Sequence, residues 1–193
     1  MMVKICGVTN LEDASAAIDG GAAALGFNFY PASPRYIAPD RAAAIAAKLP
    51  DGVWRVGVFV DEPPANVLRI ARQVGLDVAQ LHGSEKEAEY PSGIRVWKAV
   101  RMREGQHVEI AQGAAEAVLV DGPSSGITFD WARVPGGIAR LILAGGLDAG
   151  NVRQAIAQVR PWGVDACSRI ESAPGRKDRI KMAAFLKAAL EAA

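Results

Sequence analysis

The sequence predicts an α/β protein: a single (β/α)₈ barrel (TIM barrel) of minimal size, spanning residues 1–193, with one or two abbreviated helices. Short apolar runs recur along the chain, with centres near residues 4, 26, 57, 80, 98, 119, 142 and 164, so about eight strands are expected. Helical patterns separate these runs, as in repeated βα units. Several runs are almost continuously apolar, which is typical of parallel strands covered on both faces. A closed barrel is favoured over the alternative, an open doubly wound sheet, because closure leaves no strand edge unpaired.

Charge and composition exclude several classes of partner. The chain has 22 basic and 21 acidic residues, a formal charge of +1, which indicates neither nucleic acid nor an anionic membrane surface as a partner. No apolar run approaches the roughly 20 residues of a membrane span. The cysteines, Cys6 and Cys167, and the histidines, His82 and His107, show no metal-ligand spacing. Unpaired cysteines fit a reducing cytosol, and a strand beginning at Val3 leaves no room for a signal peptide, so we expect a cytoplasmic protein without a metal.

The first half of the chain alternates regularly between strand and helix patterns. Strands are predicted over residues 3–6, 24–29, 54–60 and 78–81. Helices are predicted over residues 11–18, 39–49 and 64–74, with a short helical stretch over residues 84–90. Asn10 is a suitable N-cap for the first helix, and Pro39 and Pro64 can occupy the first turns of the next two.

The second half continues the alternation with weaker helices. Strands are predicted over residues 96–100, 117–120, 141–144 and 164–166. The segment from Arg101 to Gly113 lacks clear periodicity, so no full helix is predicted there. Asp130 is expected to cap a stunted helix over residues 131–134, a helix over residues 151–159 stops before Pro161, and Asp178 caps a final helix.

Reactive side chains and glycines follow the predicted strands at their C-terminal ends. They are Cys6, Asn28, His82, Asp121, Gly145, Gly146 and Asp165. These strand ends share one rim of a barrel, where barrel enzymes keep their active sites. The loops after strands seven and eight, residues 144–147 and 167–169, are the ones that commonly bind phosphate through backbone N–H groups. A buried structural thiol and a plain strand-to-helix turn at the glycines remain the alternatives at this point.

Seven segments of the chain, in order and with matching spacing, resemble one family. They are Lys4-Ile5-Cys6-Gly7, residues 26–30 with 33–36, Val56-Gly57-Val58-Phe59-Val60, Gln80-Leu81-His82-Gly83, Phe129-Asp130-Trp131, Ala144-Gly145-Gly146-Leu147 and Pro174-Gly175-Arg176-Lys177-Asp178. Together these segments resemble the phosphoribosylanthranilate isomerases of tryptophan biosynthesis, and the resemblance spans residues 3–178.

The resemblance implies an enzyme, an intramolecular oxidoreductase of the aldose–ketose isomerase type. Its reaction would convert N-(5-phosphoribosyl)anthranilate to the enol form of 1-(2-carboxyphenylamino)-1-deoxyribulose 5-phosphate, an Amadori rearrangement. The reaction needs one acid and one base and no cofactor. A small phosphorylated substrate is therefore the expected partner, and the protein is expected to be a monomer or a homodimer.

The resemblance also implies roles for particular residues. By motif match, Cys6 takes the family's general-base position and Asp121 its general-acid position. Arg35 matches the ligand of the anthranilate carboxylate, which a planar guanidinium can hold through two oxygens. His82 would line the substrate pocket, and Asp165 would orient the substrate. The structural alternatives are a solvated loop arginine, a packing histidine and a carboxylate that anchors the last loop.

Phosphate binding is predicted for Gly145, Gly146, Ser168 and Arg169. Arg169 departs from the family pattern Asp-Val-Ser-Ser-Gly-Val-Glu, because it stands where glycine is common. If that position needs a positive φ, the loop would be strained; otherwise the arginine adds positive charge to the site.

Two other functions are alternatives to the isomerase. The related histidine-pathway aminoaldose isomerase carries aspartates at the ends of strands one and five, where this chain has Cys6 and Lys98-Ala99-Val100. A non-catalytic barrel that only binds a sugar phosphate would not need both Cys6 and Asp121.

The first and last strands are neighbours in a closed barrel, which places Cys6 and Cys167 near one seam. We therefore hypothesise that mild oxidation joins them in a disulfide and switches the enzyme off, because the disulfide consumes the base. Lys4 lies two residues before Cys6 and so on the same face of its strand, either inside the barrel near the thiol or at a solvated strand start.

Overall fold

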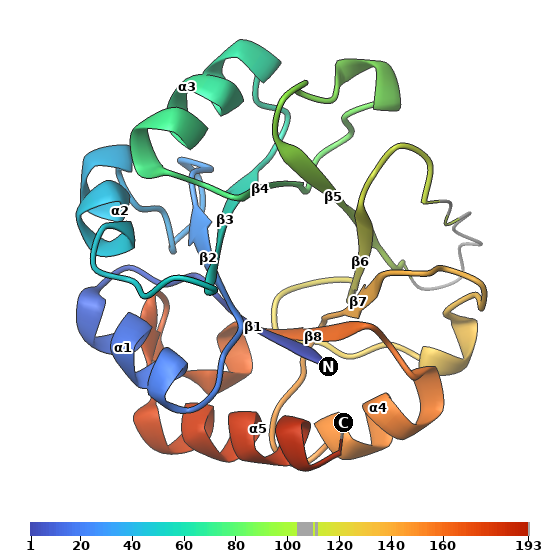
Figure 1. Cartoon of the computed structure of the whole chain (residues 1–193). Coiled ribbons are helices and arrows are strands. Elements are labelled where there is room, and N and C mark those ends of the chain that lie inside the picture. The colour runs from blue at the N-terminus through green and yellow to red at the C-terminus, as the bar shows by residue number, and fades with distance from the viewer. Residues whose placement is uncertain (104–109, 111, 193) are drawn as a thin grey trace.

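The computed structural model describes residues 1–103, 110 and 112–192, and these form a closed barrel of eight parallel strands (Figure 1). The strands are β1 (Met2–Cys6), β2 (Ala24–Asn28), β3 (Trp54–Phe59), β4 (Val78–Leu81), β5 (Arg95–Arg101), β6 (Ala117–Asp121), β7 (Leu141–Leu143) and β8 (Gly163–Ala166). Each strand pairs with the next, and β1 also pairs with β8, which closes the ring. The predicted fold class is therefore confirmed.

Helices cover the outside of the barrel (Figure 1). The α-helices are α1 (Leu11–Asp19), α2 (Pro39–Ala46), α3 (Pro64–Val74), α4 (Val152–Val159) and α5 (Arg179–Glu191). Three 3₁₀-helices complete the described part: η1 (Glu87–Glu89), η2 (Trp131–Arg133) and η3 (Ser168–Ile170). After β4 and β6 only η1 and η2 are formed, and these are the abbreviated helices. The expectation for residues 101–113 falls largely outside the described residues, and no described helix could cross a membrane.

Residues at the helix ends explain where the helices begin. The Asn10 side chain accepts a hydrogen bond from the Asp13 backbone N–H at 2.8 Å. Asp178 accepts from the N–H groups at the second and third positions of α5, both at 3.0 Å. Pro39 and Pro64 stand in the first turns of α2 and α3, where a missing N–H costs nothing. These caps match the predictions and fix the entry of the chain into each helix.

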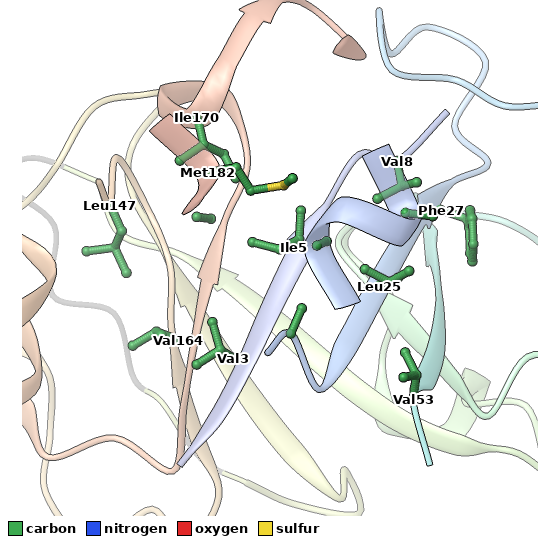
Figure 2. Packing of buried hydrophobic residues seen from close by; sticks show 14 of the residues in the cluster. Val3, Ile5, Val8, Leu25, Phe27, Val53, Leu147, Val164, Ile170 and Met182 are labelled. Atoms are coloured by element: carbon green, nitrogen blue, oxygen red, sulfur yellow. The ribbon is translucent and has the colours of Figure 1, made fainter. Parts of the chain in front are cut away.

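Alternate residues of each strand face outward and pack against the helices. Val3 and Ile5 of β1 are fully buried between Leu25 of β2, Val164 of β8 and Met182 of α5 (Figure 2). Burying one such side chain contributes roughly 1.5–3 kcal/mol. Because successive residues of a strand point to opposite faces, Lys4 and Cys6 face the barrel interior.

Tryptophans fill the N-terminal half of the barrel interior. The rings of Trp54, Trp97 and Trp162 contact one another, with centroids 5.5 to 6.3 Å apart. Arg95 and Arg140 lie over two of these rings, which is a favourable cation–π arrangement. These three tryptophans therefore serve packing inside the barrel.

A short antiparallel hairpin follows the last barrel strand and was absent from the prediction. It consists of β9 (Glu171–Ala173) and β10 (Arg176–Lys177), joined through Pro174 and Gly175. Gly175 has a φ of +78°, as a tight turn at glycine permits. Strands of two or three residues are too short to give a periodic pattern in the sequence, which is why the hairpin was not predicted. The hairpin places Glu171 and Lys177 beneath the rim of the barrel.

Candidate active site

A cavity of about 480 Å³ lies at the C-terminal ends of the barrel strands. This volume is within the roughly 300–1,000 Å³ that small-molecule sites occupy. All nine predicted site residues line it: Cys6, Arg35, His82, Asp121, Gly145, Gly146, Asp165, Ser168 and Arg169. The structure therefore brings the whole predicted set together.

Cys6 ends β1 with its side chain turned into the barrel interior and buried. A hydrogen bond from the Cys167 thiol lowers the pKa of Cys6, against the effect of burial, and the charges of Lys4 and Lys177 lower it further. A positive surrounding of this kind favours the thiolate, which is the reactive form of cysteine. Cys6 thus lines the cavity, and its surroundings favour the thiolate form.

Lys4 and Asp165 form a buried ion pair beneath Cys6. Lys4 Nζ donates to Asp165 Oδ2 at 2.9 Å, and the Lys4 side chain is 0% exposed, so the solvated strand start is excluded. Burial acts to lower the pKa of Lys4, but Asp165 and Cys6 outweigh it and raise that pKa. Burial raises the pKa of Asp165 to about 7; Lys4 opposes this rise, while Cys6 and Asp121 add to it. Asp165 Oδ1 has no hydrogen-bond partner among the described residues.

Asp121 ends β6 on another wall of the cavity. Its Oδ1 accepts a hydrogen bond from the Gly122 N–H at 2.8 Å, which fixes the orientation of the carboxyl group. His82 Nε2 lies 3.3 Å from Asp121 Oδ2, and it makes no hydrogen bond with any described residue. A carboxyl group and an imidazole therefore stand side by side with unused hydrogen-bonding capacity.

Arg35, from the loop after β2, is held by a carboxylate of the hairpin. Its Nε lies 3.0 and 3.1 Å from the two carboxylate oxygens of Glu171, and one terminal nitrogen lies 2.7 Å from Oε2. Lys177 Nζ donates to the same carboxylate at 3.0 Å. Burial acts to raise the pKa of Glu171, but Arg35 and Lys177 outweigh it and lower that pKa. Arg35 is thus a positioned guanidinium at the cavity, and the solvated loop arginine is excluded.

Backbone N–H groups at Gly145 and Gly146 form a concave edge of the cavity. Both residues have positive φ, +85° and +63°. A Cβ on Gly145 would lie 2.3 Å from the Gly122 nitrogen, and one on Gly146 would lie 2.8 Å from the Thr128 nitrogen, so only glycine fits. Within the described residues the N–H groups of both glycines make no hydrogen bond. Free N–H groups in such a turn can receive an anion.

No group of three or more potential metal ligands occurs among the described residues. His107, one of the two histidines, lies outside them. Cys6 and Asp121 bring a thiol and a carboxyl group to the cavity, which are groups that can exchange protons, and Arg35 and the turn at Gly145 bring groups that can bind an anion.

Comparison of the whole chain with known proteins decides its family. Residues 3–188 match the family described as N-(5'-phosphoribosyl)anthranilate (PRA) isomerase. The chain belongs to this isomerase family. A protein of Solibacter usitatus named N-(5'-phosphoribosyl)anthranilate isomerase is 53% identical over 196 residues, which cover 98% of this chain and 97% of the relative.

Solved structures of the isomerase family superpose closely on the chain. A phosphoribosyl anthranilate isomerase from Thermus thermophilus has a TM-score of 0.91 at 39% identity and covers 99% of both chains. A second isomerase structure, with a TM-score of 0.84 at 39% identity and the same coverage, was solved in complex with reduced 1-(o-carboxyphenylamino)-1-deoxyribulose 5-phosphate.

Arg169, the departure from the isomerase pattern, does not strain its loop. It is not among the described residues with positive φ, so the expected strain is absent. Its Nε donates to the Gly126 carbonyl and one terminal nitrogen to Asp148 Oδ2, both at 3.0 Å. The guanidinium therefore links the loops after β6, β7 and β8 at the rim.

Sequence reasoning missed three residues that support the site. Glu171 of the hairpin holds Arg35, Lys177 pairs with Glu171, and Gln80 of β4 presents a buried amide to the cavity. All three stand in segments that carry the family resemblance or the strand-eight pattern. Charged residues on both sides of the Pro174-Gly175 pair, shortly after the last buried strand, were the available signal for the hairpin.

Proposed function

We propose that this protein is a phosphoribosylanthranilate isomerase of tryptophan biosynthesis. It would convert N-(5-phosphoribosyl)anthranilate to the enol form of 1-(2-carboxyphenylamino)-1-deoxyribulose 5-phosphate. The observation that carries the proposal is that a family-matched thiol and carboxyl, Cys6 and Asp121, line one cavity with a free glycine turn.

The reaction would proceed by one proton donation and one proton removal. Asp121 gives a proton to the ribose ring oxygen, the bond from that oxygen to C1′ breaks, and the nitrogen lone pair forms a protonated Schiff base. The Cys6 thiolate then takes the proton from C2′, and the C–H electron pair becomes the C1′–C2′ double bond as the nitrogen regains its lone pair. General acid–base steps of this kind contribute about 10²–10⁴-fold each.

The two anionic ends of the substrate would be held on different parts of the rim. Arg35 would bind the anthranilate carboxylate, and the free N–H groups of Gly145 and Gly146 would bind the phosphate with Ser168 and Arg169. His82, beside Asp121, would contact the substrate in the pocket. Asp165 Oδ1, which lacks a partner among the described residues, would accept a hydrogen bond from a sugar hydroxyl.

An activity assay that follows loss of the substrate's fluorescence tests the proposal. The wild type should turn over N-(5-phosphoribosyl)anthranilate, and Cys6→Ala and Asp121→Ala should each lose at least about 100-fold in kcat. A wild type that binds the substrate without converting it would support the non-catalytic barrel. Conversion of the two-phosphate aminoaldose of the histidine pathway in its place would support that isomerase.

The site argues against the histidine-pathway alternative. That enzyme carries aspartates at the ends of strands one and five, whereas here β1 ends at Cys6 and β5 ends at Arg101. The acidic group of this cavity comes from the end of β6 instead.

A cytoplasmic location and the absence of a nucleic acid partner complete the proposal. Two free thiols and a near-neutral charge support both. The proposal includes a monomer or a homodimer: a Thermotoga maritima relative, 43% identical, is described as a dimeric enzyme from which monomers were generated. Sedimentation of the purified protein separates the two states.

A further inference from the structure

The loops after β3, β4 and β5 are tied together by one largely buried ion pair. Lys98 of β5 lies with its Nζ 2.7 Å from Oε2 of Glu85, which belongs to the loop after β4. The two side chains are only 16% and 7% exposed. The three strands are neighbours in the barrel (Figure 1). Neither side chain is among the described residues that line the cavity, so the pair would not itself contact a molecule bound there.

Lys98 holds the backbone on both sides of His82. Its Nζ lies 2.7 Å from the carbonyl oxygen of Gly83 and 3.5 Å from that of Leu81. The N–H of His82 itself donates to the carbonyl of Phe59, at the end of β3, at 2.8 Å. The chain is therefore hydrogen-bonded before, at and after His82, and this fixes the position from which the imidazole enters the cavity.

Glu85 receives two backbone N–H groups in addition to the lysine. Its Oε2 lies 2.9 Å from the Gly83 nitrogen, and its Oε1 lies 2.8 Å from the Asp61 nitrogen of the loop after β3. Hydrogen bonds to an ionised acceptor are stronger than neutral ones. Asp61 in turn accepts from the N–H and the hydroxyl of Ser84, at 2.7 and 2.8 Å. Two carboxylates thus hold the loops after β3 and β4 against each other.

The backbone of these two loops adopts a conformation that needs such support. Asp61 has a φ of +50°, which residues other than glycine seldom adopt and which persists where the surroundings determine it. A Cβ on Gly83 would lie 2.4 Å from Asp61 Oδ1 and 2.7 Å from the Asp61 nitrogen, so the two loops touch without space for a side chain. Strained backbone of this kind is found preferentially at functional sites.

We propose that Glu85 and Lys98 are positioning residues that fix the backbone around His82 and so hold its imidazole beside Asp121. His82 Nε2 lies 3.3 Å from Asp121 Oδ2, and it is the side chain through which this part of the rim reaches the carboxyl group. The kinetic part of the inference rests on the proposed function, in which Asp121 is the acid and His82 contacts the substrate. It goes beyond that function by assigning a task to two residues outside the cavity.

A double-mutant cycle with His82→Ala separates positioning from a purely structural role. Lys98→Met removes the donor to the two carbonyls, and Glu85→Gln removes the charge that receives the two N–H groups. Each should lower kcat/KM about tenfold or more, because misplacing a group by about 1 Å can cost about 100-fold. In the His82→Ala background each should lower it less than about twofold, since the group that they position is gone. Equal losses in both backgrounds overturn the inference, as does full activity of both single variants.

Glu116→Gln is the matched control, because Glu116 is also a partly buried carboxylate with two ion-pair partners. It pairs with Arg95 and Arg140 at the N-terminal end of the barrel, opposite to the cavity. This variant should lose stability in urea unfolding while its kcat/KM stays at the wild-type value. A fall in kcat/KM as large as that of Glu85→Gln would show that loss of stability alone explains the effect, and the inference would fail.

Nuclear magnetic resonance of the imidazole gives a readout that does not depend on turnover. The chain has two histidines, so the ring C–H signals of His82 are identified by their absence from His82→Ala. These signals should shift in Lys98→Met and Glu85→Gln and stay in place in Glu116→Gln. Signals that stay in place in all three variants overturn the inference. If they shift as expected but the wild type does not convert N-(5-phosphoribosyl)anthranilate, the positioning stands and the proposed function fails.

Discussion

At the scale of single residues, the site contains buried charged side chains that form ion pairs with one another. Glu171 is the centre of one such group, because it binds both Arg35 and Lys177. Removing one partner of a buried ion pair leaves an uncompensated charge, which is far more costly than removing an exposed pair.

Glu171→Gln should lower the free energy of unfolding by about 3–5 kcal/mol at neutral pH, because Lys177, with a 0% exposed side chain, loses its counter-charge. The folded-state pKa of Glu171 is lowered, so its stabilisation is present above its unfolded value of 4.5 and is lost as pH falls through the folded value. Urea unfolding at neutral and acidic pH measures this, and the difference between wild type and variant should shrink in acid. Glu191→Gln, which removes exposed ion pairs with Arg153 and Lys187, is the matched control. Equal losses in the two variants would contradict the account.

Oxidation of the thiol pair remains a prediction. Hydrogen peroxide should take two electrons from Cys6 and Cys167, forming one disulfide while the peroxide becomes two water molecules. Strands about 4.8 Å apart place the Cα atoms within the range that a disulfide spans. Activity should fall and return with dithiothreitol, and peptide mapping should find the Cys6–Cys167 link. Activity lost while both thiols stay free would refute the idea.

At the scale of elements, the loops after β6, β7 and β8 form one unit at the rim. Arg169 links them, and the close approach of Gly145 to Gly122 leaves no space for a side chain. We therefore expect anion binding by this turn to depend on backbone conformation more than on side-chain charge.

Gly145→Ala should raise the KM for the phosphorylated substrate at least about tenfold, equivalent to roughly 1.4 kcal/mol of lost binding. The added Cβ would lie 2.3 Å from the Gly122 nitrogen, so the loop must shift and its N–H groups turn away. Steady-state kinetics measure the change. Gly136→Ala is the control, because its Cβ meets nothing within 4 Å and its φ is not positive. An unchanged KM in Gly145→Ala would show that the turn does not bind the phosphate.

At the scale of the whole molecule, the pattern of strands and helices was predictable because each barrel strand is a short apolar run and most helices begin at a cap. The set of cavity residues was also predictable, since parallel strands deliver their C-terminal ends to one rim. The pairing of Lys4 with Asp165 and the hairpin that carries Glu171 and Lys177 were not. Contacts between residues far apart in sequence depend on register and loop path, which leave no local signal.

We propose that residues 1–193 form one domain. Thermal unfolding should then give a single transition with coincident loss of helical signal and tryptophan fluorescence, because Trp54, Trp97 and Trp162 pack inside the barrel. Two separated transitions would contradict a single domain.

The proposed role of Cys6 as the base of an isomerase site is best examined with the Cys6→Ala variant, with binding and turnover measured on the same sample. The reduced 1-(o-carboxyphenylamino)-1-deoxyribulose 5-phosphate that occupies a related isomerase serves as the binding probe. If Cys6 is the base, the variant should bind this compound about as well as the wild type, while kcat falls by about 10²–10⁴-fold. A variant that binds the compound and turns over substrate at the wild-type rate would contradict the account.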